Sequence, residues 1–249
     1  MAQVSSPSSV SNANQPVDAT TTSCKEKRVI VIDPGHGGDT DLQGSSHNNA
    51  TAASGVLEKT LTLQYAQSLK THLESEQIQN IFKGKGYCEV KILLTRSSDV
   101  NLTGKDRVKV ATDNKADILM SIHFNGADKK VRGTETYYRT ASNGYQSNEK
   151  EDIALAGQVN AAALKAIQAL GPGARDRKVK PDTETRAKQI AVLRDPGIGL
   201  SGKMCRSCLL EVEFIDVPAV DVLLVSGPNA STNRSSIMLE VAKALANAL

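Results

Sequence analysis

The stretch RVIVIDPGHGG, residues 28–38, decides the fold class. Its residues 29–32 form an unbroken run of β-branched side chains, which is typical of a strand covered on both faces. Pro34 and the glycines after it do not continue a strand, so we expect the chain to turn there into a loop. His36 lies in that loop, directly beyond the strand. The sequence therefore places a chemically capable side chain at the carboxyl end of a buried strand.

Strand and helix patterns alternate along the rest of the chain. Apolar residues recur at helical spacing from Leu57 to Leu73 and again farther along. The predicted helices cover 57–82, 105–112, 152–170 and 235–248, and the further predicted strands cover 90–95, 118–124, 134–138, 190–193 and 208–215. Residues 39–55 and 174–188 are polar and are expected to be loops. This alternation predicts an α/β fold, a twisted and mostly parallel sheet of about six strands flanked by helices on both faces.

The composition indicates one folded domain with a tail. A chain of 249 residues is long enough for one α/β domain, which we expect at 28–249. Residues 1–27 are rich in Ser, Thr, Asn, Ala and Pro and are expected to form a disordered tail or linker. The formal net charge of +3 gives no reason to expect a nucleic-acid partner. We also expect no membrane span, because no apolar run reaches the length needed to cross a bilayer.

The start of the chain leaves the compartment open. Residues 1–27 contain no hydrophobic segment of the kind found in a secretory signal. If Met1 is the native start, a cytoplasmic location follows. The alternative is that a signal peptide was removed and replaced by Met1, which would make the protein extracytoplasmic, periplasmic or secreted.

The cysteines do not form a zinc ribbon. The sequence has four of them, and only Cys205 and Cys208 have C-x-x-C spacing, with no second pair to complete such a site. We favour two buried thiols or a local disulfide at these positions. A redox pair is the alternative, but the pattern lacks the helix start that would lower a thiol pKa.

Four residues far apart in the sequence are candidates for one metal site. His36 and His123 each follow or end a predicted strand, Glu58 opens the first long helix, and Glu211 lies in the last core strand. Ligands of α/β sheets bind beyond the carboxyl ends of the strands, which is where these side chains are expected to meet. Two histidines and one carboxylate, with a fourth position open, are typical of catalytic zinc. Each residue taken singly has an ordinary explanation, except that Glu211 inside an apolar strand is costly to bury without a partner.

The same residues belong to a set of motifs that appear in a characteristic order. These are VIDPGHGG (31–38), EK (58–59), LTR (94–96), Arg107, AD (116–117), SIHFN (121–125), GTETYY (133–138) and LEVEF (210–214). In this combination the chain resembles the zinc-dependent N-acetylmuramoyl-L-alanine amidases, over nearly all of residues 28–249. The resemblance implies an α/β fold with a largely parallel sheet and activity on peptidoglycan. It also implies one Zn²⁺ ion bound by His36, Glu58 and His123, with Glu211 as the catalytic carboxylate.

The chain departs from the family pattern in two places. Glu213 stands where the family usually has Gly. Because strand side chains alternate, Glu213 could share a face with Glu211 and raise its pKa, but we favour a position beyond the strand end in solvent. The segment between His36 and Glu58 is longer than usual and contains His47, which we expect to be exposed rather than a ligand.

Other polar residues are expected to support the site. Asn125 is placed either to contact the substrate or the shell around the metal, or to cap its own loop. Arg96 and Arg107 are expected to be structural. Residues 139–151 are short and polar, with no apolar stripe of the kind that an inhibitory helix needs. We therefore expect peptidoglycan, or muramyl peptides, as the partner, and no activator protein.

Two other functions fit part of the pattern. One is a zinc carboxypeptidase or related peptidase on a similar framework, although the His-x-x-Glu spacing common in such enzymes is absent here. The other is an inactive module that binds peptidoglycan.

Overall fold

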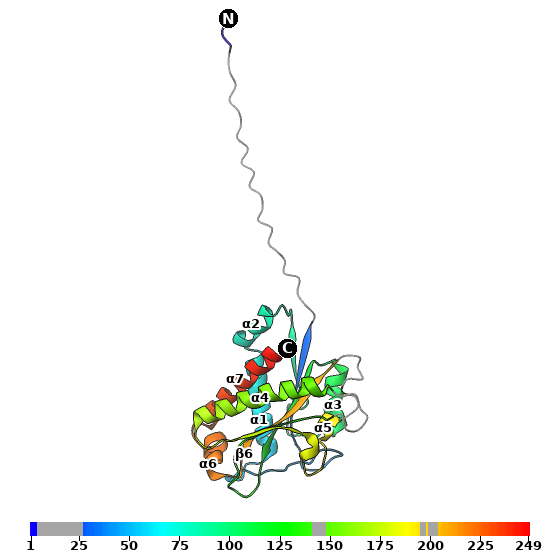
Figure 1. Ribbon diagram of the computed structural model, residues 1–249, viewed down its shortest axis with the longest axis vertical. Helices are drawn as coiled ribbons and strands as arrows, with labels where there is room; N and C mark the ends of the chain where they lie inside the picture. The colour runs from blue at the N-terminus through cyan, green and yellow to red at the C-terminus, as the bar shows by residue number, and fades with distance from the viewer. Residues whose placement is uncertain (4–26, 141–147, 195–197, 199–203) are drawn as a thin grey trace.

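The fold is built on one six-stranded sheet. The computed structural model describes residues 1–3, 27–140, 148–194, 198 and 204–249, so most of the expected tail, with Cys24, lies outside the described residues. The strand order is β2-β1-β3-β6-β4-β5. Figure 1 shows the sheet and the helices that surround it. The strands are β1 Arg28–Pro34, β2 Val90–Leu94, β3 Ile118–Asn125, β4 Thr134–Tyr138, β5 Asp176–Pro181 and β6 Arg206–Phe214. All neighbouring pairs are parallel except β4 and β6, which are antiparallel.

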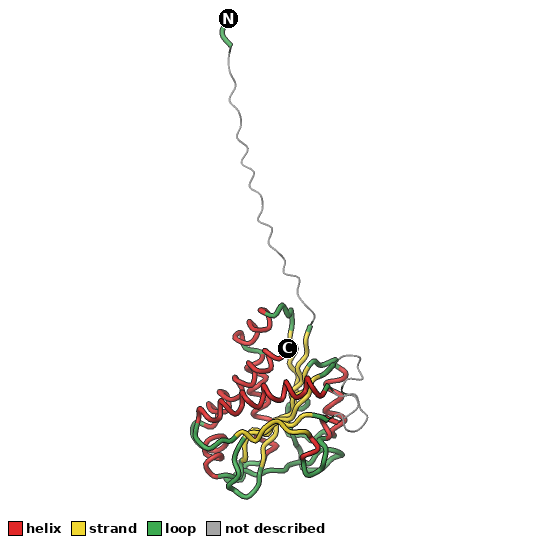
Figure 2. The backbone as a smooth tube through the Cα atoms, viewed as in Figure 1, coloured by secondary structure: helices red, strands yellow, loops and turns green. Residues whose placement is uncertain are grey.

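Helices cover both faces of this sheet. They are α1 Glu58–Leu73, α2 Glu76–Gly84, α3 Gly104–Asp113, α4 Glu149–Leu170, α5 Ala191–Arg194, α6 Pro218–Asp221 and α7 Ala230–Ala248. Figure 2 shows helices on both sides of the strands. Ile30 and Ile32 of β1 pack in one core with α1, α4 and α7, whereas Val31 packs in the other with α3 and α5. Successive residues of β1 therefore enter opposite cores, which explains its unbroken apolar run. The predicted α/β fold is confirmed.

Three local predictions were wrong. Residues 174–188 contain β5, whose sequence DRKVKP is polar because this edge strand pairs with β4 alone. Residues 190–193, expected as a strand, belong largely to α5, since a short apolar run does not distinguish the two. The helix expected at 57–82 is two helices, because Ser75 is extended between α1 and α2.

Helix α4 is long and apolar enough to span a membrane by length and composition, contrary to the expectation from the sequence. Its apolar residues have another explanation in this fold. Leu155, Val159 and Ile167 are buried in the core that α4 shares with α7 and the sheet. The composition of α4 is therefore that of a core helix, and this feature is weak evidence for a membrane span.

The cysteine pair is structural. Cys205 and Cys208 are both free and buried. Burial raises the pKa of Cys205 to about 12 and that of Cys208 still higher, so neither is a ready thiolate. Two buried thiols, one of the two favoured alternatives, is what the structure shows. Cys88, which precedes β2, is disulfide-bonded.

Asp152 in the first turn of α4 makes stability depend on pH. Its Oδ1 accepts a 2.7 Å hydrogen bond from Ser207 N, but its Oδ2 is buried without a partner. Burial raises the pKa of Asp152 from 3.8 to about 7. Between these values the folded state holds a proton that the unfolded state has lost, so this residue lowers stability as pH rises from about 4 to 7.

We predict that Asp152→Asn stabilises the protein at pH 7.5 but not at pH 4. The gain is on the order of 1–4 kcal/mol, because each unit of pKa shift corresponds to roughly 1.4 kcal/mol. Urea unfolding at both pH values measures it. Asp113→Asn, at an exposed position of α3, is the control and should show no such pH dependence. An equal effect of Asp152→Asn at both pH values would contradict the assignment.

Candidate metal centre

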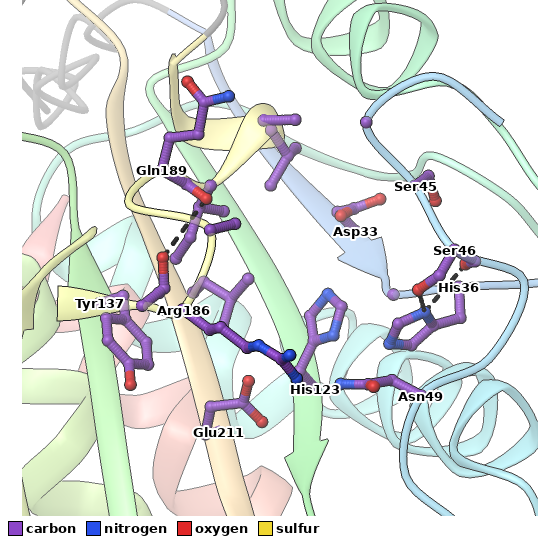
Figure 3. A pocket seen from close by; sticks show the side chains of 18 of the residues that line it. Asp33, His36, Ser45, Ser46, Asn49, His123, Tyr137, Arg186, Gln189 and Glu211 are labelled. Carbon is purple, nitrogen blue, oxygen red and sulfur yellow. Dashed lines mark hydrogen bonds between the residues drawn. The ribbon is translucent and has the colours of Figure 1, made fainter. Parts of the chain in front are cut away.

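The four candidate residues meet at the carboxyl edge of the sheet. His36 follows β1, His123 lies near the end of β3, and Glu211 lies near the end of β6. His123 and Glu211 are direct neighbours in the parallel register of β3 and β6. Glu58 is the first residue of α1, the helix that returns over β1. Figure 3 shows His36, His123 and Glu211 around one cavity.

Three of these side chains converge closely enough to share an ion. One ligand atom from each of His36, Glu58 and His123 lies within 4.8 Å of the others. Glu58 Oε1 is 3.1 Å from His36 Nε2 and 3.1 Å from His123 Nδ1. The imidazole rings meet edge to face, with centroids 4.7 Å apart.

The hydrogen bonds of these residues fit a bound cation. His36 Nδ1 lies 2.9 Å from the carbonyl oxygen of Ser46, so Nδ1–H donates there and the lone pair of Nε2 faces Glu58. That Nε2 is buried and has no hydrogen-bond partner. A buried, unpartnered nitrogen, a carboxylate and a second imidazole side by side fit the donor set of a divalent metal.

Glu58 is held as a carboxylate. Burial would raise its pKa, but the imidazoles of His123 and His36, each 3.1 Å from Glu58 Oε1, outweigh this effect and lower the pKa well below its usual range. Two backbone groups also donate to it, Ala50 N at 2.8 Å and Phe124 N at 2.9 Å. Burial lowers the pKa of His123, which favours the neutral imidazole that a metal requires.

The loop that carries His36 is fixed by its backbone and by two arginines. His36 has φ 61°, in the left-handed region, and a Cβ on Gly35 would lie 2.3 Å from the His123 ring. Arg107 pairs with buried Asp33 at 2.8 Å and donates to the carbonyl oxygen of His36. Arg96 donates to the carbonyl oxygen of Gly35. Both arginines are buried and structural, as expected.

Glu211 carries an uncommitted carboxylate. It lines the cavity, and its Oε2 is buried without a hydrogen-bond partner. Burial, and then the charges of Glu58 and Glu135, raise the pKa of Glu211 well above its usual value. A carboxyl group with a raised pKa and a free oxygen can accept and return a proton during a reaction.

Glu213 is not in solvent, so the favoured prediction was wrong. Its side chain is fully buried and accepts hydrogen bonds from Gly133 N at 2.9 Å and Arg132 Nε at 3.2 Å. The reason is that β6 continues to Phe214, so Glu213 lies within the strand and not beyond its end. The segment before β4 covers the Glu213 side chain there.

Asn125 contacts Glu135, a residue at the site that the sequence analysis did not predict. Asn125 lines the cavity and donates to Glu135 Oε1 at 2.9 Å. Glu135 is the direct neighbour of Glu211 across β4 and β6, and its Oε2 binds Arg177 and Lys180. An acidic residue in the middle of the predicted strand 134–138 was the available signal.

The cavity is about 450 Å³ and reaches beyond the metal centre. Arg186 and Gln189, from the segment before α5, line its far wall (Figure 3). His47 is half-exposed and its Nδ1 lies 2.6 Å from Asp41 Oδ1, so it is outside the ligand group, as expected. Of residues 139–151, where no inhibitory helix was expected, 141–147 lie outside the described residues.

Known proteins are similar to this chain in sequence and in fold. Residues 30–247 match the Amidase_3 family, described as N-acetylmuramoyl-L-alanine amidase. The sporulation-specific N-acetylmuramoyl-L-alanine amidase of Bacillus subtilis is 42% identical over 96 residues, which are 39% of this chain and 31% of that protein. The chain spans 61%, 31% and 25% of three curated relatives that it matches.

Two solved structures from Clostridium difficile share the fold. An N-acetylmuramoyl-L-alanine amidase of strain 630 superposes with a TM-score of 0.65 at 21% identity, covering 89% of this chain and 96% of that one. The CwlD amidase of Clostridioides difficile, solved in complex with the GerS lipoprotein, has a TM-score of 0.60 at 17% identity, covering 89% and 98%.

The buried pair of Arg107 and Asp33 yields a stability prediction. Arg107→Met should lower the free energy of unfolding by about 3–5 kcal/mol, because Asp33 loses its charged partner while it stays buried. Lys109→Met removes an exposed ion pair with Asp113 from the same helix, and should change stability by less than about 1 kcal/mol. Urea unfolding at pH 7 compares them, and equal losses would disprove the structural role of Arg107.

Proposed function

Since the chain belongs to the Amidase_3 family of N-acetylmuramoyl-L-alanine amidases, we propose that it hydrolyses the amide bond between N-acetylmuramic acid and L-alanine in peptidoglycan. One observation carries the proposal beyond the family match. The group of His36, Glu58 and His123 lies at the same cavity as the uncommitted carboxylate of Glu211. A metal-binding group beside a proton-transfer group is what amide hydrolysis requires.

We propose zinc as the metal, with His36, Glu58 and His123 as its three protein ligands. Their atom types, and the open side toward the cavity, fit catalytic zinc. When bound, zinc supplies a Lewis acid that lowers the pKa of water and stabilises negative charge on the substrate carbonyl oxygen. Ser46 holds the His36 ring in the tautomer that this role needs.

Glu211 is the proposed proton carrier. As water adds to the carbonyl carbon of the lactyl group, the Glu211 carboxylate takes one of the water protons. When the carbon–nitrogen bond breaks, the same proton passes to the nitrogen of L-alanine, which leaves as an amine. The raised pKa of Glu211 favours holding the proton between these two steps. Glu135, neutralised by Arg177 and Lys180, keeps Asn125 oriented at the rim of the cavity.

Two alternative functions fit the site less well. A peptidoglycan-binding module has no use for a buried, unpartnered carboxylate beside a ligand group, because that arrangement costs stability. A carboxypeptidase would use the same metal chemistry but release single terminal residues. The products therefore decide between these enzymes.

We propose that the protein acts outside the cytoplasm, on peptidoglycan, without an activator. The disulfide at Cys88 supports an oxidising compartment. In the part of the chain that the structure describes, the cavity beside Glu211 has room for a substrate. This room supports activity without a partner protein. The complex of CwlD with GerS shows a lipoprotein partner for that amidase, and a partner here is the alternative.

The proposed function is tested by mass spectrometry of purified peptidoglycan digested by the protein alone. Intact stem peptides with a free L-alanine amine should appear, and a chelator should stop their release. Release of single terminal residues would identify a peptidase instead. Inactivity until a second protein is added would remove the proposal of independent action.

The role of Glu211 predicts a selective loss. Glu211→Gln should lower kcat by roughly 10²–10⁴-fold and leave the zinc content unchanged, because the amide removes proton transfer but none of the ligands. Glu184→Gln, a matched change at an exposed position on the same cavity, should keep near-normal turnover. Turnover by the Glu211 variant within a fewfold of wild type would exclude this carboxylate as the proton carrier.

A further inference from the structure

A second cavity, of about 480 Å³, is surrounded by positive charge. Four of its lining residues are the cations Lys130, Arg132, Arg175 and Arg177, and the others are Val131 and Gly173. No acidic residue lines it among the described parts of the chain. We call it the basic pocket.

The basic pocket lies on the same edge of the sheet as the metal centre. Strand β4 runs antiparallel to β6, and β5 runs parallel to β4, so both begin where β6 ends. Arg132 lies two residues before β4, Arg175 directly precedes β5, and Arg177 is near the start of β5. The pocket is therefore reached from Glu211 by moving along this edge past β4.

A hydrogen-bonded chain connects the two cavities. Arg177 Nε donates to Glu135 Oε2 at 2.8 Å, and Glu135 Oε1 accepts from Asn125 at the rim of the metal cavity. The wall between the pockets is thus made of groups held in place by one shared carboxylate.

Two cations of the pocket are held rigidly. Arg132 donates through Nε to Glu213 and through Nη1 to the carbonyl oxygen of Pro172 at 2.7 Å. Gly173 has φ +105°, and a Cβ there would lie 2.5 Å from Arg132 Nη1. The absence of a side chain at Gly173 therefore leaves room for this guanidinium. Arg177 lies over the ring of Phe214 at 4.9 Å.

The other two cations are uncommitted. Lys130 and Arg175 are exposed, and no ion pair is formed by either side chain among the described residues, although the charge of Asp128 acts on Lys130. Glu213 and Glu135 pair with Arg132 and Arg177, so the lining of the pocket keeps an excess of positive charge. Fixed guanidinium groups flanked by exposed cations suit an oxyanion, and a carboxylate in particular.

We propose that the basic pocket binds a carboxylate of the peptide stem, so that the stem lies along the sheet edge from the metal centre to β5. This inference rests on the proposed function, because it takes the leaving peptide as the ligand. It makes Lys130 and Arg175 determinants of substrate affinity, with no part in bond cleavage.

Binding of a released stem peptide tests the pocket separately from catalysis. Isothermal titration of an L-alanine-initiated tripeptide should show roughly tenfold weaker binding to Lys130→Ala/Arg175→Ala than to wild type, with the difference shrinking at high salt. The matched control is Lys83→Ala/Lys105→Ala, which removes two exposed cations elsewhere and should bind as wild type does. The same peptide with its carboxyl groups amidated should bind all three proteins equally weakly.

Kinetics on the intact muramyl tripeptide complete the test. The Lys130/Arg175 variant should show a KM raised by about the same factor, with kcat nearly unchanged. Equal peptide binding by variant and wild type would overturn the proposal, as would an equal loss on the amidated peptide. Wild type that binds the peptide but cleaves no muramyl peptide would instead refute the proposed function and leave the pocket intact.

Discussion

The site depends on one buried carboxylate. Glu58 lies between two imidazoles at 3.1 Å from each, and backbone N–H groups from two distant segments donate to it. These donors tie the loop before α1 to the end of β3. A charge that is fully buried stays ionised only when its surroundings compensate it this completely. Both histidines are therefore arranged around a single anchored carboxylate.

Two arginines stabilise further polar groups around the metal centre. Arg107 and Arg96 donate to carbonyl oxygens of the loop after β1, and Arg107 also neutralises Asp33 beneath it. These contacts add to the loop's own hydrogen bond between His36 and Ser46 and hold His36 in its left-handed conformation. On the other side, Glu135 and Glu213 hold Arg177 and Arg132 at the edge of the sheet. Buried acid–base pairs thus position both the metal centre and the basic pocket.

The sequence was most informative where burial is complete. β1 and β3 are covered on both faces, so their apolar runs predicted them, and the strand-end rule then brought His36, Glu58, His123 and Glu211 together. It was least informative at the edge, where β5 is polar and was missed. The contact of Glu213 with Gly133 and the pairing of Glu135 with Glu211 depend on the register between distant strands. Local patterns do not encode that register, so these two residues needed the structure.

We propose that three side chains, brought together by this fold, bind one zinc ion. Anomalous diffraction on either side of the zinc absorption edge, from crystals of the purified protein, locates such an ion. One edge-dependent peak should lie about 2.0–2.2 Å from ligand atoms of His36, Glu58 and His123. A protein that cleaves peptidoglycan while its crystals show no such peak at these residues would contradict zinc binding by this group.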